Sequence, residues 1–134
     1  MSLFKRFKEF WANSINKSAF INANESKKQF YACEYLESPP LNKDIFGNNF
    51  IVVAPNKVPK WALFQCPCNC GHVITLNLSP KKNPRWGVHI EKDGSPSLFP
   101  SVRQITGCLS HFWIKNGKVF WCYDTGKQYV PDYK

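Results

Sequence analysis

The sequence predicts a mainly β protein, in which a small antiparallel β domain with a cysteine-rich knuckle follows an N-terminal amphipathic helix. Short runs of aromatic and β-branched residues recur from residue 29 onward, and prolines separate them. The pair Asn116–Gly117 stands between two of these runs and is typical of a two-residue hairpin turn. Three cysteines are crowded into the stretch CPCNCGH, residues 66–72.

The first element is the helix, predicted over residues 3–21. Charged residues alternate with apolar ones at helical spacing, and the apolar ones are Leu3, Phe7, Phe10, Trp11 and Ile15. The polar segment 22–29 then predicts a linker. We expect the aromatic face of the helix to dock on the β domain. The alternative is a membrane or partner surface, because basic residues flank that face.

After the linker, the chain predicts a series of strands and turns. Strands are expected at residues 29–36, 49–54, 61–65, 72–78, 85–91, 110–114 and 118–122. The last two form the hairpin around Asn116–Gly117. The sequence therefore divides into a helix and linker (1–28), a β domain (29–123) and a C-terminal tail (124–134).

The composition is that of a folded and basic chain. Its 134 residues carry 18 Lys and Arg against 9 Asp and Glu, a net charge of +9 that favours acidic partners such as nucleic acid. No stretch is apolar enough to span a bilayer, and the charged N-terminal stretch is unlike a secretory signal, so we expect a cytoplasmic protein. Thiols stay reduced there, so the six cysteines indicate a metal or catalysis before disulfides.

The knuckle predicts a metal site. Cys66, Cys68 and Cys70 converge on one point only if the chain curls, and the Pro, Asn and Gly that follow them in turn favour a curl. Thiolates select Zn²⁺ or an iron–sulfur cluster, and structural zinc takes four ligands in a tetrahedron. We therefore predict a zinc knuckle that holds a structural Zn²⁺.

The fourth ligand must come from elsewhere in the chain. We favour Cys108, which follows a glycine at the base of the predicted hairpin, where a loop reaches a neighbouring strand end. His72 is the main alternative, and His111 is also available. Cys33 and Cys122 lie in apolar runs, and we expect them to be buried as small hydrophobic residues.

A second candidate site is centred on His111, because histidine accepts a proton near neutral pH. A serine becomes a nucleophile when such a base lies within hydrogen-bond reach. On a strand, Ser110 and His111 point to opposite faces, so Ser101, on a proline-bounded loop, is the favoured nucleophile. Ser110 shares a face with Cys108 and is expected to hydrogen-bond its thiolate.

A carboxylate usually orients the base in such a site. We expect Glu37 to do so, with Glu34 and Glu91 as alternatives. In a variant of this hypothesis the zinc is catalytic, with His72 or His111 as a ligand and Glu37 as the base. The variant is less favoured, because several thiolates make the metal a poor Lewis acid.

Taken in order, the motifs of the chain resemble a bacterial family catalogued as a domain of unknown function. The motifs are YLESPP (35–40), CPCNCG (66–71), LSP (78–80), PSLFPSV (96–102), GCLSHFWI (107–114) and NGKVFWC (116–122). Family members are similar in having a Cys-x-Cys-Gly-Cys-Gly knuckle, then Pro-Ser-Ile/Val, then Cys-Arg-Ser-His-Tyr/Phe-Trp-Ile. The resemblance covers residues 30–122, and the combination is specific although each motif alone is weak.

Genes of this family lie beside those for ubiquitin-like proteins and their activating and conjugating enzymes, often in phage-defence settings. The resemblance implies a zinc-bearing peptidase that processes a ubiquitin-like protein or removes it from targets. The matching metal positions are Cys66, Cys68, Cys70 and Cys108, and the matching candidate catalytic positions are Glu37, Ser101, Ser110 and His111.

The chain departs from the family pattern at two positions. Asn69 replaces a glycine of the knuckle, which is tolerated because Asn also accepts a positive φ. Leu109 replaces the arginine before Ser–His and so removes a cation from the site. Arg103 and Arg85 are the candidates to replace that cation.

The alternative function is a non-catalytic zinc-binding module that recognises a ubiquitin-like protein or nucleic acid. Exposed aromatic rings beside cations would stack on single-stranded bases, and Trp61 beside Lys60 and Trp86 beside Arg85 have this pattern. We expect both rings to pack in the core instead, because the domain is rich in aromatic residues.

Overall fold

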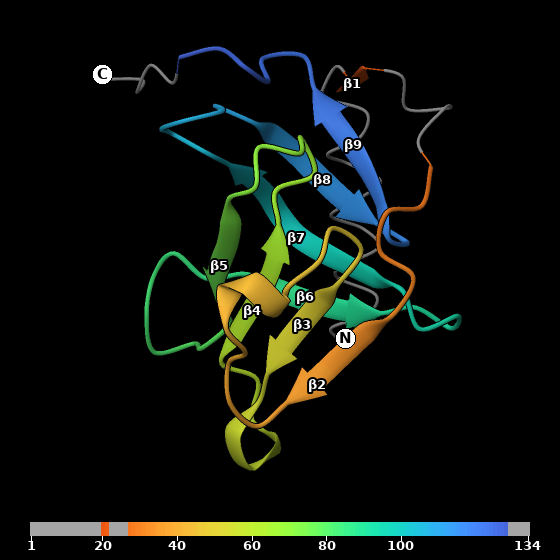
Figure 1. Cartoon of the computed structure of the whole chain (residues 1–134), viewed down its shortest axis with the longest axis vertical. Coiled ribbons are helices and arrows are strands. Elements are labelled where there is room, and N and C mark those ends of the chain that lie inside the picture. The colour runs from red at the N-terminus through yellow and green to blue at the C-terminus, as the bar shows by residue number, and fades with distance from the viewer. Residues whose placement is uncertain (1–19, 22–26, 129–134) are drawn as a thin grey trace.

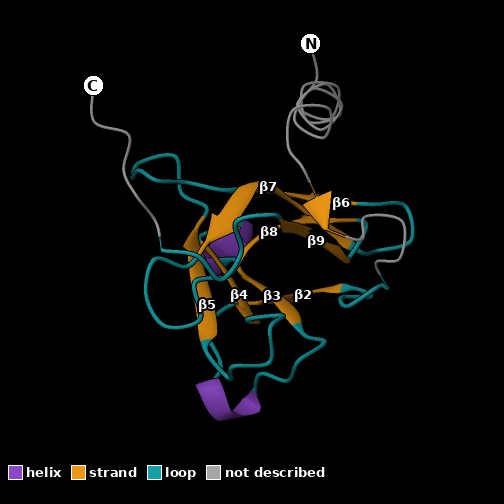
Figure 2. Cartoon of the chain, turned by 90° about the horizontal axis from the view of Figure 1, so that it is seen from above, coloured by secondary structure: helices purple, strands orange, loops and turns teal. Residues whose placement is uncertain are grey.

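Two β-sheets packed face to face make up the part of the chain that the computed structural model describes, residues 20–21 and 27–128 (Figures 1 and 2). The strands are β1 (Phe20–Ile21), β2 (Cys33–Leu36), β3 (Phe50–Val53), β4 (Trp61–Gln65), β5 (Val73–Asn77), β6 (Gly87–Ile90), β7 (Pro96–Arg103), β8 (His111–Lys115) and β9 (Lys118–Cys122). The mainly β class is therefore confirmed.

The smaller sheet has four strands in the order β2-β3-β4-β5. Strands β3, β4 and β5 pair antiparallel, as expected. Strand β2 instead pairs parallel with β3, in the register Cys33↔Phe50 to Leu36↔Val53. The chain between them passes through the 3-10 helix η2 (Asn42–Asp44), and this long connection lets β3 start at the same end of the sheet as β2.

The larger sheet has five strands in the order β1-β9-β8-β7-β6, all paired antiparallel. The predicted hairpin is present, because Lys115 pairs with Lys118 across the turn Asn116–Gly117. Both turn residues have positive φ, 51° and 71°. Glycine is required at 117 for a second reason, since a Cβ there would lie 1.8 Å from the Phe30 carbonyl oxygen.

Sequence reasoning does not find strand β7, because Pro96 and Pro100 are typical of breaks between strands and predict a loop around Ser101. The segment is an eight-residue strand between β6 and β8. Its register with β8 shifts between Leu98 and Val102, so Pro100 lies where the ladder is irregular. A proline is tolerated at such a bulge because no ladder hydrogen bond is required of it. Ser101 therefore lies on a strand and not on a loop.

The N-terminal prediction is wrong at its last two residues, since Phe20–Ile21 is a strand that pairs with β9. The rest of the predicted helix, and its docking, lie outside the described residues. In residues 20–21 and 27–128, no helix is long and apolar enough to cross a membrane.

The main core lies between the two sheets (Figure 2). Its largest side chains are Phe30, Phe50, Phe64, Phe112, Leu98 and Ile114, and four of these rings contact one another, the closest pair with centroids 5.2 Å apart. Side chains alternate along a strand, so Phe112 and Ile114 of β8 face this core while His111 and Trp113 face away. The outward face of the larger sheet thus carries His111.

Candidate active site and metal centre

Strands β7 and β8 bring the polar residues together on the outward face of the larger sheet. Arg103 on β7 pairs directly with His111 on β8. Ser101 lies two residues before Arg103, so it occupies the same face and is the diagonal neighbour of His111. Ser101 and His111 are ten residues apart in sequence, and the antiparallel pairing of β7 with β8 brings them together.

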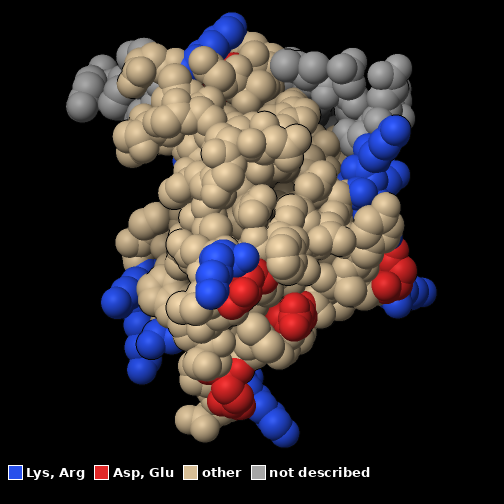
Figure 3. Space-filling model, in the orientation of Figure 1, with Lys and Arg blue, Asp and Glu red and all other residues tan. Residues whose placement is uncertain are grey.

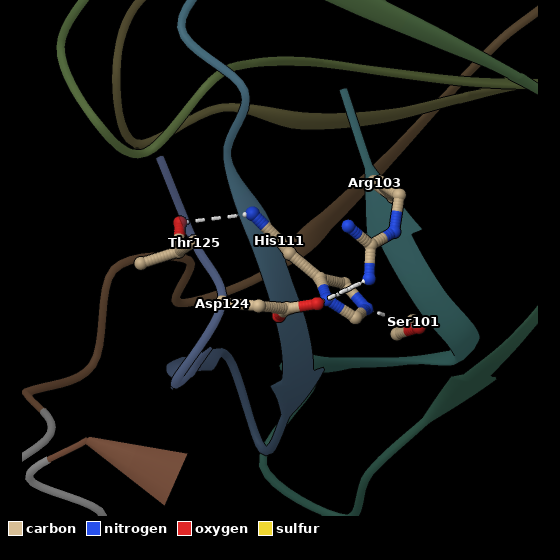
Figure 4. A network of polar contacts seen from close by, with 5 residues as sticks. All are labelled: Ser101, Arg103, His111, Asp124 and Thr125. Carbon is tan, nitrogen blue, oxygen red and sulfur yellow. Dashed lines mark hydrogen bonds and ion pairs between the residues drawn. The ribbon is translucent and has the colours of Figure 1, made fainter. Parts of the chain in front are cut away.

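The imidazole of His111 has a hydrogen-bond partner at each ring nitrogen (Figure 4). Its Nε2 lies 3.1 Å from the Ser101 hydroxyl, and its Nδ1 lies 2.7 Å from Oδ1 of Asp124. The His111 backbone N–H also donates to Oγ1 of Thr125 at 2.9 Å. The arrangement is that of a serine, a base and an orienting carboxylate.

Asp124 also contacts the guanidinium of Arg103. One terminal nitrogen of Arg103 donates to Oδ2 of Asp124 at 2.5 Å and lies 2.9 Å from Nδ1 of His111. Burial acts to raise the pKa of Asp124, but hydrogen bonds from Arg103 and His111 outweigh it and hold the pKa below its ordinary value. Asp124 is therefore ionised at neutral pH and available to orient the ring.

Cys122 lies beside this group, since ligand atoms of His111, Cys122 and Asp124 all lie within 4.8 Å of one another. The guanidinium of Arg103 already provides the cation that contacts His111 and Asp124. Cys122 is buried, as expected, and burial followed by the charge of Asp124 raises its pKa to about 11.

The backbone at Ser101 is held by Trp86, whose indole N–H donates to the Ser101 carbonyl at 3.3 Å. The Trp86 ring packs against the main core, and Trp61 packs against a smaller cluster on the other sheet. Both rings are partly buried at the margin of a cluster, and Lys60 Nζ lies 6.0 Å from the centroid of the Trp61 ring.

On the face seen in Figure 3, the described Lys and Arg side chains stand in separate groups, several of them beside acidic ones.

The structure does not bring Glu37 to His111, whose Nδ1 faces Asp124 instead. It follows β2 at the edge of the smaller sheet, where its carboxylate accepts a hydrogen bond from the Asn56 backbone at 3.1 Å. His111 lies on the outward face of the other sheet, and the core separates the two. Of the alternatives, Glu34 is exposed on β2, and Glu91 lies 3.5 Å from His89 and accepts from Ser97.

Cys66, Cys68, Cys70 and Cys108 form the second cluster, with all four sulfur atoms within 4.8 Å of one another. Sγ of Cys66 lies 3.4 Å from that of Cys68 and 3.7 Å from that of Cys108. Zn–S bonds of about 2.3 Å place the corners of a tetrahedron about 3.8 Å apart. The donor set therefore fits a single Zn²⁺, and Cys108 completes it.

Two loops shape this cluster. The knuckle loop closes with a hydrogen bond from the Cys66 N–H to the His72 carbonyl at 2.8 Å, and Asn69 has φ 69°, as its tolerance of positive φ predicted. His72 contributes its backbone there, and its side chain is exposed. The second loop, residues 107–110, contains Gly107 and Leu109 at positive φ. Each loop folds back sharply enough to present its sulfur atoms to one point.

Ser110 lies at the cysteine cluster and not at His111. Its buried hydroxyl donates to Sγ of Cys108 at 3.2 Å, as strand alternation predicted. Burial acts to raise the pKa of the Cys108 thiol, but hydrogen bonds from the Ser110 hydroxyl and backbone outweigh it and lower the pKa to about 7. Ser110 therefore serves the sulfur cluster, on the opposite side of β8 from His111.

Sequence reasoning does not find Asp124 and Thr125, because the pattern of residues 124–134 predicts a tail. The register of the β8–β9 hairpin nevertheless indicates that a residue just after β9 lies near His111. Since Phe112 pairs with Trp121, the end of β9 lies beside the start of β8, and a residue just after β9 falls next to His111. An acidic residue two positions beyond the hairpin was thus a better candidate than any glutamate before residue 92.

Comparison with known proteins identifies the family. A family model described as "Bacterial ubiquitination-like system serine protease (BubE)" matches residues 37–122, about two thirds of the chain. The chain belongs to this family, as its motifs indicated. No curated protein and no solved structure matches the chain. Membership indicates a serine-protease-like role in a bacterial ubiquitination-like system.

Proposed function

We propose that this member of the bacterial ubiquitination-like serine protease family hydrolyses a peptide or isopeptide bond at the C-terminal tail of a ubiquitin-like protein, with Ser101 as the nucleophile. The observation that carries the proposal is the continuous chain of contacts Ser101–His111–Asp124, with distances of 3.1 and 2.7 Å. Three residues of these types in this order are the machinery of acyl transfer in serine hydrolases.

The reaction follows from the geometry. His111 Nε2 takes the Ser101 proton as the oxygen attacks the carbonyl carbon, while Asp124 accepts the Nδ1–H and stabilises the imidazolium. Nε2–H then protonates the leaving nitrogen, and the C–N bond breaks. A water molecule then attacks the acyl carbon as His111 takes its proton. The bond between Ser101 Oγ and the acyl carbon breaks, and Nε2–H returns the proton to Oγ. The family's description as a serine protease supports this class of reaction.

The four cysteines are proposed to hold a structural Zn²⁺. A bound zinc would cross-link the two loops, and the chemistry that it supplies there is coordination of thiolates, not activation of water. The Cys108 loop leads directly into β8, so holding it fixed also fixes the start of the strand that carries His111.

The proposed partners follow from the system to which the family belongs. A ubiquitin-like protein would be the substrate, and the enzymes that activate and conjugate it would act on the same tail. The tail of such a protein is an extended chain, which a strand edge binds well. We also propose that the protein acts in the cytoplasm, in a defence setting against phage.

The test is cleavage of a ubiquitin-like protein that carries extra residues after its C-terminal tail, with the products identified by mass spectrometry. The wild type should release the extension, and Ser101→Ala or His111→Ala should lower the rate by at least about 10³-fold. Ser38→Ala is a matched control, because Ser38 is an exposed serine outside the site. A serine-directed fluorophosphonate should label Ser101.

The proposal fails if His111→Ala cleaves as fast as the wild type. A wild type that binds the ubiquitin-like protein without cleaving it would favour the non-catalytic module. Inactivation by a thiol reagent should occur only together with zinc release, since no cysteine acts as the nucleophile. Inactivation with zinc retained would contradict the assignment of Ser101.

A further inference from the structure

The contact between Arg103 and the imidazole is unusual for a serine–histidine–aspartate arrangement. The guanidinium nitrogen lies 2.9 Å from Nδ1 of His111, on the nitrogen that also faces Asp124 at 2.7 Å. Arginine donates only and stays charged at every relevant pH. A permanent cation therefore stands against the ring nitrogen through which Asp124 acts.

The two neighbours of Nδ1 have opposite effects on the ring. A carboxylate alone favours the protonated imidazolium, whereas a cation at this distance disfavours it. In the described part of the chain, the charged and titratable groups facing His111 are Arg103 from β7, Cys122 from β9 and Asp124 from the turn that follows. Arg103 is the positive member of this set, and it also neutralises Asp124 through the 2.5 Å contact.

We propose that Arg103 is a positioning residue that fixes the Asp124 carboxylate and keeps the resting His111 ring neutral, so that Nε2 is free to accept the Ser101 proton. The inference rests on the proposed function for its catalytic meaning, although its charge effect is independent of any substrate.

The test is an NMR titration of the histidine ring protons in the full chain. The chain has three histidines, so the His111 signal is assigned by its loss in His111→Gln. In Arg103→Gln, the His111 titration midpoint should move upward by about one pH unit or more, because Asp124 then acts on the ring without the opposing cation. Arg103→Lys should move it less, and Lys43→Gln, which removes an exposed cation on η2, should not move it.

Amide spectra first establish that each variant is folded, and Arg103→Met replaces Arg103→Gln if the latter unfolds. A midpoint that stays within about 0.3 unit of the wild type, or moves down, overturns the inference. If the wild type also cleaves the ubiquitin-like substrate, the acidic limb of the kcat/KM profile of Arg103→Gln should shift from that of the wild type in the same direction as the His111 midpoint. A midpoint shift without any cleavage would reject the proposed function alone, and cleavage without a midpoint shift would reject the role of Arg103 alone.

Discussion

At the scale of single residues, the candidate site depends on one histidine with different partners on its two nitrogens. His111 contacts Ser101 through Nε2 and Asp124 through Nδ1, and its side chain is only 16% exposed. Partial burial strengthens these hydrogen bonds, because water competes less for the same atoms. The motifs favour Glu37 as the orienting carboxylate, whereas the structure places Asp124 beside Nδ1.

Asp124→Asn should lower kcat/KM by about 10³- to 10⁴-fold, because an amide no longer holds the ring in the tautomer that leaves Nε2 free. Peptidase assays of purified variants measure this. Asp44→Asn, at an exposed carboxylate on η2, is the matched control. Glu37→Gln should lose at least about 100-fold less activity than Asp124→Asn. If Glu37→Gln is the more damaging change, Asp124 is not the orienting group.

At the scale of elements, the loop before β8 connects the cysteine cluster to the serine–histidine site. It carries Cys108, whose sulfur lies 3.7 Å from that of Cys66, and it leads into His111 three residues later. Leu109 in the same loop accepts a hydrogen bond from the Gly126 N–H at 2.7 Å. The turn that carries Asp124 is therefore attached to the loop that carries a cysteine of the cluster.

Removal of the metal should therefore affect both stability and the site. We expect the wild type to contain one zinc per chain by elemental analysis, and Cys108→Ser to lose most of it. The melting temperature of Cys108→Ser should fall by roughly 5 °C or more, because the two loops are no longer cross-linked. Cys33→Ser is the control, since Cys33 is a half-buried cysteine outside the cluster whose pKa burial raises to about 12. Full zinc in Cys108→Ser would exclude Cys108 as a ligand.

At the scale of the whole molecule, the main core and the serine–histidine site lie on opposite faces of the larger sheet. The faces between the sheets hold the main core, while the outward face of the larger sheet holds Ser101, Arg103 and His111. Residues on both sides of the predicted β domain join this sheet. Lys28 bridges to Lys118, and Thr125 contacts the His111 backbone. We propose that residues 29–123 fold as the β domain, although Asp124 and Thr125, beyond its end, belong to the candidate site.

Truncation tests this division. A chain ending at residue 123 keeps all nine strands of the described structure but loses Asp124 and Thr125. It should remain folded by circular dichroism and lose at least about 10³-fold in kcat/KM. A chain ending at residue 128 should keep the activity of the full chain. Equal activity of the two truncated chains would place the orienting carboxylate before residue 124.

Local sequence pattern was enough to predict most of the strands, the hairpin turn and the direction of several side chains. Alternating aromatic and β-branched residues and the Asn116–Gly117 turn predicted seven of the strands in place and the hairpin in register. Strand alternation separated Ser110 from His111, and the tight spacing of the cysteines predicted their convergence. These inferences hold because side-chain direction and turn conformation are set by a residue and its near neighbours.

Features that depend on which strands are adjacent could be seen only in the folded chain. Strand β7 is a strand because β6 and β8 flank it, despite its prolines, and Ser101 reaches His111 through that pairing. The parallel pairing of β2 places Glu37 at the far edge of the other sheet, and the end of β9 places Asp124 at the start of β8. Contacts of this kind are set by long-range packing, which local sequence does not encode.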